Sequence, residues 1–191
     1  MDFKMKKRLL AATAAVALAS PLAMANSSPV MFSSLNGFNA PDANAVGGVR
    51  LAVLHGKVGE VKGVDFPLLG MSETNTTTGV NFGLMFGGSK VNQQMTGVSF
   101  GLFNWMPGQT TGANVSAVNI TNNVKGLNFG AVNYSQGMTV ADVAFASVSK
   151  SSNFQLGFFN MTDKIDGVQI GLINCADNGF FKCFPIVNFA K

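Results

Sequence analysis

The sequence holds few residues that could form a catalytic centre, and the clearest candidate is a Gly-x-Ser-x-Gly segment at residues 97–101. Such a segment can form the nucleophile elbow of a hydrolase, which requires a strand–turn–helix context and a histidine later in the chain. The single histidine, His55, precedes Ser99, and the segment is also the start of a strand repeat described below. We therefore interpret Ser99 as a strand residue and predict no catalytic residue.

Metal and cofactor chemistry also lacks suitable residues. One histidine and two cysteines are too few for a transition-metal site. The carboxylates, such as Glu73 and Asp163, fall mostly in expected turns, and the glycines recur at strand spacing without forming a phosphate-binding loop. We predict no metal, no cofactor and no enzymatic activity.

The two cysteines, Cys175 and Cys183, lie eight residues apart and lack the Cys-x-x-Cys spacing of redox sites. In an exported protein, two cysteines at this distance are typical of a structural disulfide that closes a short loop. We predict this bridge, with free thiols or intermolecular pairing as the alternatives.

Export is predicted from residues 1–25, which resemble a secretory signal peptide. Four basic residues precede an apolar run at residues 9–19, and Ala23-Met24-Ala25 is a small-x-small cleavage site. The remaining chain holds nine Lys and Arg against eight Asp and Glu, so the basic character of the whole chain belongs to the signal. This near-neutral balance predicts no nucleic-acid partner.

One short unit recurs about ten times after the signal. Its clearest copy is Gly-Val-Gln-Ile-Gly-Leu-Ile-Asn at residues 167–174. The copies are 13 to 18 residues apart, most often 14, and begin at Gly48, Gly63, Gly79, Gly97, Gly112, Gly126, Val140, Asn153, Gly167 and Phe181. We predict a β-repeat domain over residues 48–191, preceded by an N-terminal extended segment at residues 26–47.

The eight positions of the unit alternate in character. Position 4 is large and apolar in every copy, positions 2 and 6 are apolar in nearly all, position 5 is small or proline, and position 8 is usually asparagine. Position 3 is polar in the first nine copies, where it holds Arg50, Asp65, Asn81, Ser99, Asn114, Asn128, Asp142, Gln155 and Gln169. A period of two indicates a β-strand, and we expect positions 2, 4 and 6 to face the core.

Two all-β architectures can use this unit. In a β-solenoid, equivalent positions stack and position 8 forms an asparagine ladder, but the connectors, such as Thr121-Asn122-Asn123, offer nothing apolar for a return strand to bury. In an antiparallel meander, each unit is one strand, and large apolar residues pair across neighbours at position 4. We favour a meander of about ten strands that closes into a barrel, which removes the two sheet edges. The solenoid is the alternative.

The repeat resembles a family of bacterial envelope surface-repeat proteins. The resemblance covers roughly residues 48–191 and is most specific over residues 166–189, where the unit at 167–174 is followed by Phe-Pro-Ile-Val-Asn-Phe at 184–189. Some members of that family carry the label polyhydroxyalkanoate synthase. A synthase of that kind needs a cysteine in a Gly-x-Cys-x-Gly elbow, and neither cysteine has that context. The resemblance implies an envelope location and no established activity.

Three functions follow as hypotheses. The first is a structural or interaction module of the periplasm or cell surface, which could self-associate through exposed apolar residues at position 7. The second is a soluble barrel that carries a lipid-like apolar ligand. The third is a small outer-membrane barrel, although an apolar stripe of about 15 Å is short for a membrane barrel, whose apolar band is about 25 Å tall.

Overall fold

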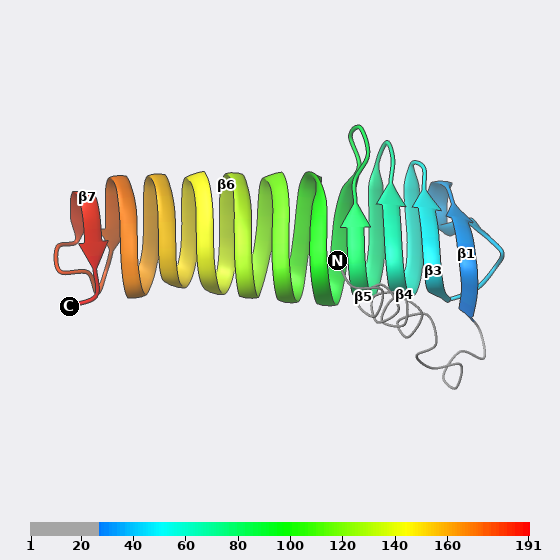
Figure 1. Cartoon of the computed structure of the whole chain (residues 1–191), viewed down its shortest axis with the longest axis horizontal. Helices are drawn as coiled ribbons and strands as arrows, with labels where there is room; N and C mark the ends of the chain where they lie inside the picture. Colours follow the sequence, from blue (N-terminus) through cyan, green and yellow to red (C-terminus); the bar gives the residue numbers. More distant parts are fainter. Residues whose placement is uncertain (1–26) are drawn as a thin grey trace, which may run out of the picture.

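The computed structural model describes residues 27–191 and shows a rod of stacked β-coils (Figure 1). The predicted signal peptide lies outside these residues. The elements are β1 (Ser27–Ser33), the 3-10 turn η2 (Leu35–Gly37), β2 (Asn39–Ala40), β3 (Ala45–Ala52), β4 (His55–Pro67), β5 (Met71–Phe82), β6 (Gly88–Ala176) and β7 (Cys183–Phe189). Within the described part of the chain, no helix is long and apolar enough to cross a membrane.

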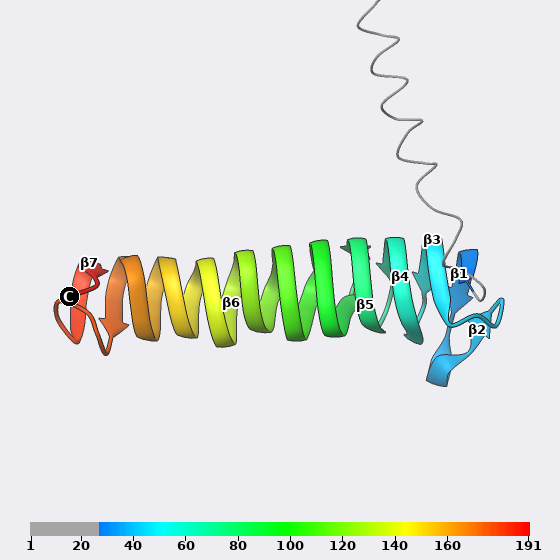
Figure 2. The ribbon, with the colours of Figure 1, turned by 90° about the horizontal axis from the view of Figure 1, so that it is seen from below.

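The coils stack in parallel, so the predicted antiparallel meander and its barrel are wrong and the solenoid alternative is confirmed. The strand order is β2-β1-β3-β4-β5-β6-β7, and β3, β4, β5 and β6 pair in parallel. β6 alone runs for 89 residues because it winds through successive coils without a break (Figure 2).

The register places equivalent positions of the unit side by side. Val64 pairs with Val80 between β4 and β5, and Phe82 pairs with Phe100 between β5 and β6. The alignment of the copies is therefore confirmed in these strands, whereas the predicted strand direction is not. Position 4 meets position 4 in the next coil, as expected, but along a parallel ladder.

The buried face is the opposite of the predicted one. All nine polar residues at position 3 are at most 1% exposed, whereas Phe82 and Phe129 at position 4 are 43% and 49% exposed. Alternation assigns the apolar positions to the core only where polar side chains cannot be satisfied inside the fold. Buried amides and hydroxyls are tolerated when they find hydrogen-bond partners, and here many of them do so in the next coil, as Asn114 does with Asn128 at 2.9 Å.

Asparagine and glutamine ladders run along the interior of the rod. At position 8, Asn119 donates to Asn133 at 2.9 Å and accepts from Asn104 at 3.2 Å. At position 3, Gln169 donates to Gln155 at 2.7 Å. The ladder at position 8 is the one that the solenoid alternative predicts.

The return segments bury side chains too, which removes the main argument against a solenoid. Thr121, Val124, Thr139, Thr162 and Ile165 are at most 3% exposed. Each connector thus places a hydroxyl or one apolar side chain inside the rod, and only its remaining residues form the surface.

Glycine at position 1 is required where the coils approach most closely. Gly112 has a φ of 132° and Gly126 a φ of 154°, in the region that favours glycine. A Cβ built on Gly112 would lie 1.9 Å from the carbonyl oxygen of Gly97, and one on Gly126 would lie 1.8 Å from that of Gly112. A column of glycines therefore permits the stacking of these coils.

Both ends of the rod depart from the regular stacking. At the N-terminal end, β1 pairs in parallel with β3 and antiparallel with the short β2. At the C-terminal end, β7 pairs antiparallel with the last turn of β6, so the tenth copy reverses direction instead of adding another coil. Its Asn188 is buried and donates to the carbonyl oxygen of Phe181 at 3.0 Å.

The predicted disulfide is confirmed. Cys175, near the end of β6, is bonded to Cys183, the first residue of β7, with an S–S distance of 2.07 Å. The bridge fixes the short loop through which the chain reverses direction.

Candidate interaction surface

The Gly-x-Ser-x-Gly segment lies in the regular stacking and does not form an elbow. Ser99 is completely buried, and its Oγ donates to Oδ1 of Asn104 at 2.8 Å. The amide of Asn104 donates back to the carbonyl oxygen of Ser99 at 3.1 Å. His55, in contrast, has a 43% exposed side chain. Ser99 therefore belongs to the interior ladder, while His55 lies on the surface.

His55 belongs to a small polar cluster around Glu73 on β5. Its Nε2 is 3.6 Å from Oε2 of Glu73, and Nζ of Lys90 is 3.4 Å from Oε1. The hydrogen bond from Asn92, followed by the charge of Lys90, holds the pKa of the Glu73 carboxyl below its usual range. No group of metal-ligating side chains is present in residues 27–191. The cluster thus offers a set of surface ion pairs.

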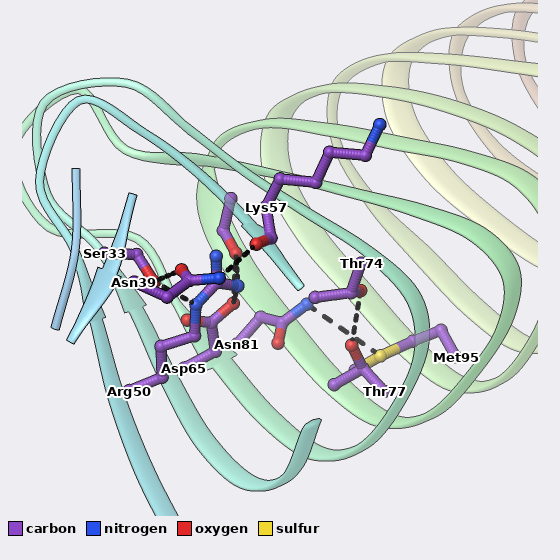
Figure 3. Close-up of polar contacts among 10 residues, drawn as sticks. Ser33, Asn39, Arg50, Lys57, Asp65, Thr74, Thr77, Asn81 and Met95 are labelled. Atoms are coloured by element: carbon purple, nitrogen blue, oxygen red, sulfur yellow. Dashed lines mark hydrogen bonds and ion pairs between the residues drawn. The ribbon is translucent and has the colours of Figure 1, made fainter. Parts of the chain in front are cut away.

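A buried ion pair lies between the first coils (Figure 3). Nη1 of Arg50 is 3.5 Å from Oδ2 of Asp65 and donates to Oγ of Ser72 at 2.8 Å, while Nε donates to Oγ of Ser33 at 2.9 Å. Burial raises the pKa of Asp65 and lowers that of Arg50, against the mutual attraction of the two charges. A Cβ on Gly56 would lie 2.5 Å from Nη2 of Arg50, so Gly56 leaves room for the guanidinium.

The same view shows hydrogen bonds that join neighbouring interior side chains. Ser33 donates to Asn39 at 2.7 Å, and the hydroxyls of Thr74 and Thr77 are 2.8 Å apart. These contacts connect residues within the coils and at the N-terminal end. They stabilise the rod and leave no accessible reacting group, so the surface is where a partner can be recognised.

The outward positions 2, 4 and 6 of β6 form one continuous face without a charged residue, here called the apolar face. It consists of three columns that run along the rod. Position 2 contributes Val98, Ala113, Leu127, Ala141, Phe154 and Val168; position 4 contributes Phe100, Val115, Phe129, Val143, Leu156 and Ile170; and position 6 contributes Leu102, Ala117, Ala131, Phe145, Phe158 and Leu172.

The column at position 6 is the most exposed and the most uneven. Phe145, Phe158 and Leu172 are 54–58% exposed, and the rings of Phe145 and Phe158 stack with centroids 4.9 Å apart. Ala117 and Ala131 precede them in the same column and are exposed as well. The apolar face therefore has a phenylalanine ridge beside an alanine depression.

Two hollows lie along the apolar face and meet at Phe129. One, of about 710 Å³, extends over Phe129, Leu156 and Ile170 toward β7. The other, of about 590 Å³, extends from Phe129 over Ala117 toward Phe82. Small residues at position 5, such as Gly130, form the floor of both. Together they make a groove along the rod between the columns at positions 4 and 6.

Charged side chains lie away from this face, in the return segments. Lys125, Lys150, Asp163, Lys164 and Asp166 are all exposed there. Exposed apolar side chains such as Tyr134, Phe159 and Met161 also lie outside the apolar face, so what distinguishes that face is the absence of charge. Sequence reasoning identified every residue of the apolar face but assigned it to the core, because it placed the polar positions outside.

No protein-family model matches this chain, and neither a curated protein nor a solved structure is detectably similar to it. The function has to be argued from the surface. Contiguous exposed apolar patches of more than a few hundred square ångströms are typical of sites that bind proteins, membranes or apolar ligands.

Proposed function

We propose that this chain is a non-enzymatic β-repeat protein of the bacterial cell envelope, with a structural or interaction role exerted through the apolar face. The observation that carries the proposal is the column of exposed phenylalanine and leucine side chains over β6, among them Leu102, Phe145, Phe158 and Leu172. Water contact with such a face is unfavourable, and covering it with another apolar surface is favourable.

The rigidity of the rod supports this role. The interior ladders hold each coil on the next, so the outward side chains keep a fixed spacing along the axis. Apolar residues presented on a rigid, regular sheet lose little conformational freedom on binding, which favours association. A structural partner would therefore meet a preformed surface.

An envelope location is part of the proposal. It is supported by the secretory signal expected at residues 1–25 and by the resemblance of the repeat to envelope surface-repeat proteins. The Cys175–Cys183 disulfide is also typical of an oxidising compartment. We infer a periplasmic or cell-surface protein that binds no nucleic acid.

Photo-crosslinking in the producing cells tests the docking role. A benzoylphenylalanine placed at Phe129, in the middle of the apolar face, is compared with one at Val148, which is 38% exposed but lies outside that face. We expect adducts with envelope components, including other copies of this chain, from position 129 and few from position 148. Equal yields at both positions, or none at 129, would contradict the proposal. Recovery of the protein only from the cytoplasm would contradict the envelope location.

A second candidate function is the transport or storage of a lipid-like ligand. The hollow of about 710 Å³ supports it, because its lining includes Phe145, Leu156, Phe158 and Ile170 and it lies open on the apolar face. The ligand site is then this external groove, whereas the sequence argument had placed it inside a barrel. Native mass spectrometry of protein taken from cells should show a bound fatty acid or phospholipid. A clean apo mass, with no binding of a fluorescent fatty acid, would remove this candidate.

A further inference from the structure

We propose that the apolar face docks on the same face of a second copy of this chain, and that the two rods lie antiparallel. The two-fold axis runs parallel to the strands and passes between the coils that start at Gly126 and Val140. This proposal rests on the docking role of the apolar face and names its occupant. It follows from the distribution of large and small side chains on the face.

The column at position 6 is complementary to itself in this arrangement. The axis places Phe145 of one copy over Ala131 of the other, and Phe158 over Ala117. The stacked rings of Phe145 and Phe158 thus enter the alanine depression of the partner, and the partner's two rings enter the depression of the first copy. A two-fold interface must match a patch to itself in this way.

The other two columns agree with the same axis. At position 2, the axis places Phe154 over Ala113, the largest side chain of that column over one of its smallest. At position 4, it places Leu156 over the smaller Val115. In the four central coils, large residues therefore meet smaller ones in all three columns, which is how two packed sheets interdigitate. In the outer pair of coils, Leu102 meets Leu172 and Phe100 meets Ile170, so residues of similar size face each other there.

Neighbouring arrangements lack this match. Moving the axis by half a coil spacing in one direction places Phe145 on Phe145, and moving it in the other places Ala131 on Ala131. Turning the rods parallel instead brings position 6 over position 2 of the same coil, so that Phe158 meets Phe154. These alternatives create either a steric clash or a void, both of which are costly in close-packed interfaces.

The size and charge of the face fit a dimer. β7 extends the face, because Val187 and Phe189 pair with Ile170 and Val168 of β6. β5 extends it at the other end, because the exposed Phe82 pairs with Phe100. The six coils of β6 with β5 and β7 make about eight rungs at ~4.8 Å, each ~16 Å wide, which give roughly 600 Å² per copy and roughly 1,200 Å² in total, the lower limit for a specific interface. The apolar face contains no charged residue, so association would not remove any charge of that face from water.

A volume swap tests the proposal on the purified full chain. Sedimentation equilibrium should show a dimer for the wild type, and Phe145→Ala and Ala131→Phe should each weaken it by about tenfold or more, since each disturbs two symmetric contacts. The double variant Phe145→Ala/Ala131→Phe exchanges ridge and depression and should restore the affinity to within a few fold. Val148→Phe, a size increase outside the face, should leave it unchanged. A far-UV spectrum like that of the wild type shows that each variant is folded.

A second measurement reads the register directly. Benzoylphenylalanine at position 158 should join the tryptic peptide 151–164 of one copy to the peptide 91–125 of an isotope-labelled second copy. A monomeric wild type, an unrescued double variant or a crosslink to another peptide would overturn the proposed dimer. If the wild type is monomeric but position 129 still crosslinks in cells where position 148 does not, the docking role stands and only the second copy is excluded.

Discussion

Arg50 and Asp65 occupy the same position of two successive coils, and Nη1 of the arginine lies 3.5 Å from Oδ2 of the aspartate with both side chains completely buried. Elsewhere along this ladder the stacked partners are mostly neutral amides and hydroxyls. The pair therefore marks the N-terminal coils with a charge contact that only this register satisfies. Neither charge can lose its partner without being left buried and uncompensated.

Removing one member of this pair should be strongly destabilising. Asp65→Ala leaves the Arg50 guanidinium buried without its counter-ion, and the expected loss is about 3–5 kcal/mol in the free energy of unfolding. Glu60→Ala is the matched control, because Glu60 forms an exposed ion pair with Lys62 at 3.0 Å. Its expected loss is at most about 1 kcal/mol. Urea unfolding measures both, and similar losses would show that burial of the Arg50–Asp65 pair is not decisive.

The interior asparagines should matter far more than exposed ones. Asn119 accepts from Asn104 and from Ser116, and donates to Asn133 and to the carbonyl oxygen of Phe129. Asn119→Ala leaves several buried groups without a partner, and we expect a loss of about 2–4 kcal/mol on urea unfolding. Asn153→Ala, at an exposed position, should change stability by less than about 0.5 kcal/mol. Equal effects would contradict the ladder.

The ionised form of Asp142 should lower stability at neutral pH. Burial raises the pKa of its carboxyl, more than the hydrogen bonds from Thr139, Asn128 and Ser152 lower it. A raised folded pKa means that the protonated form is favoured in the folded state. The stabilising contribution is therefore complete below the unfolded pKa, about 3.9, and is lost as pH rises through the folded pKa.

Asp142→Asn, which matches the asparagines at position 3 of the two preceding coils, removes this pH dependence. At pH 7 the variant should be more stable than the wild type by on the order of 1 kcal/mol. The difference should shrink as the pH falls toward 3, in thermal melts recorded across that range. Asp163→Asn, in an exposed turn, is the control and should change little at any pH. A constant difference between the Asp142→Asn variant and the wild type would argue against a raised pKa.

The sequence alone predicted the repeat, the strand period and the disulfide, since each depends only on residue type and spacing. It could not tell which side of the strand is buried. Alternation separates Asn128 from Phe129, but it assigns the apolar residue to the core only if amides cannot be satisfied inside. In a solenoid the next coil satisfies them, as Asp142 does for Asn128 at 3.0 Å. The recurrence of asparagine at position 8 was the available sign of such stacking.

The same inversion hid the candidate site. Position 6 holds Ala131 in one coil and Phe145 in the next. If that column faced inward, this change in size would indicate only how the core is packed. Once the column faces solvent, the same residues form a ridge and a depression on the surface. The ridge and the depression of the apolar face could therefore be recognised only from the fold, although the sequence contains each of their residues.

The disulfide should stabilise the end of the rod more than its middle. Cys175 and Cys183 tie the reversed strand β7 to the last turn of β6. Under non-reducing conditions, intact mass should be about two units below the reduced value. Replacing both cysteines with serine removes the closure of a short loop, and we expect a loss of about 2–3 kcal/mol in the free energy of unfolding.

Hydrogen exchange locates the effect along the rod. Amides of residues 183–189 should exchange faster in the variant, while those around Asn119 keep the protection that stacked coils on both sides provide. Uniformly faster exchange along the rod would instead show that β7 is required for the stability of every coil.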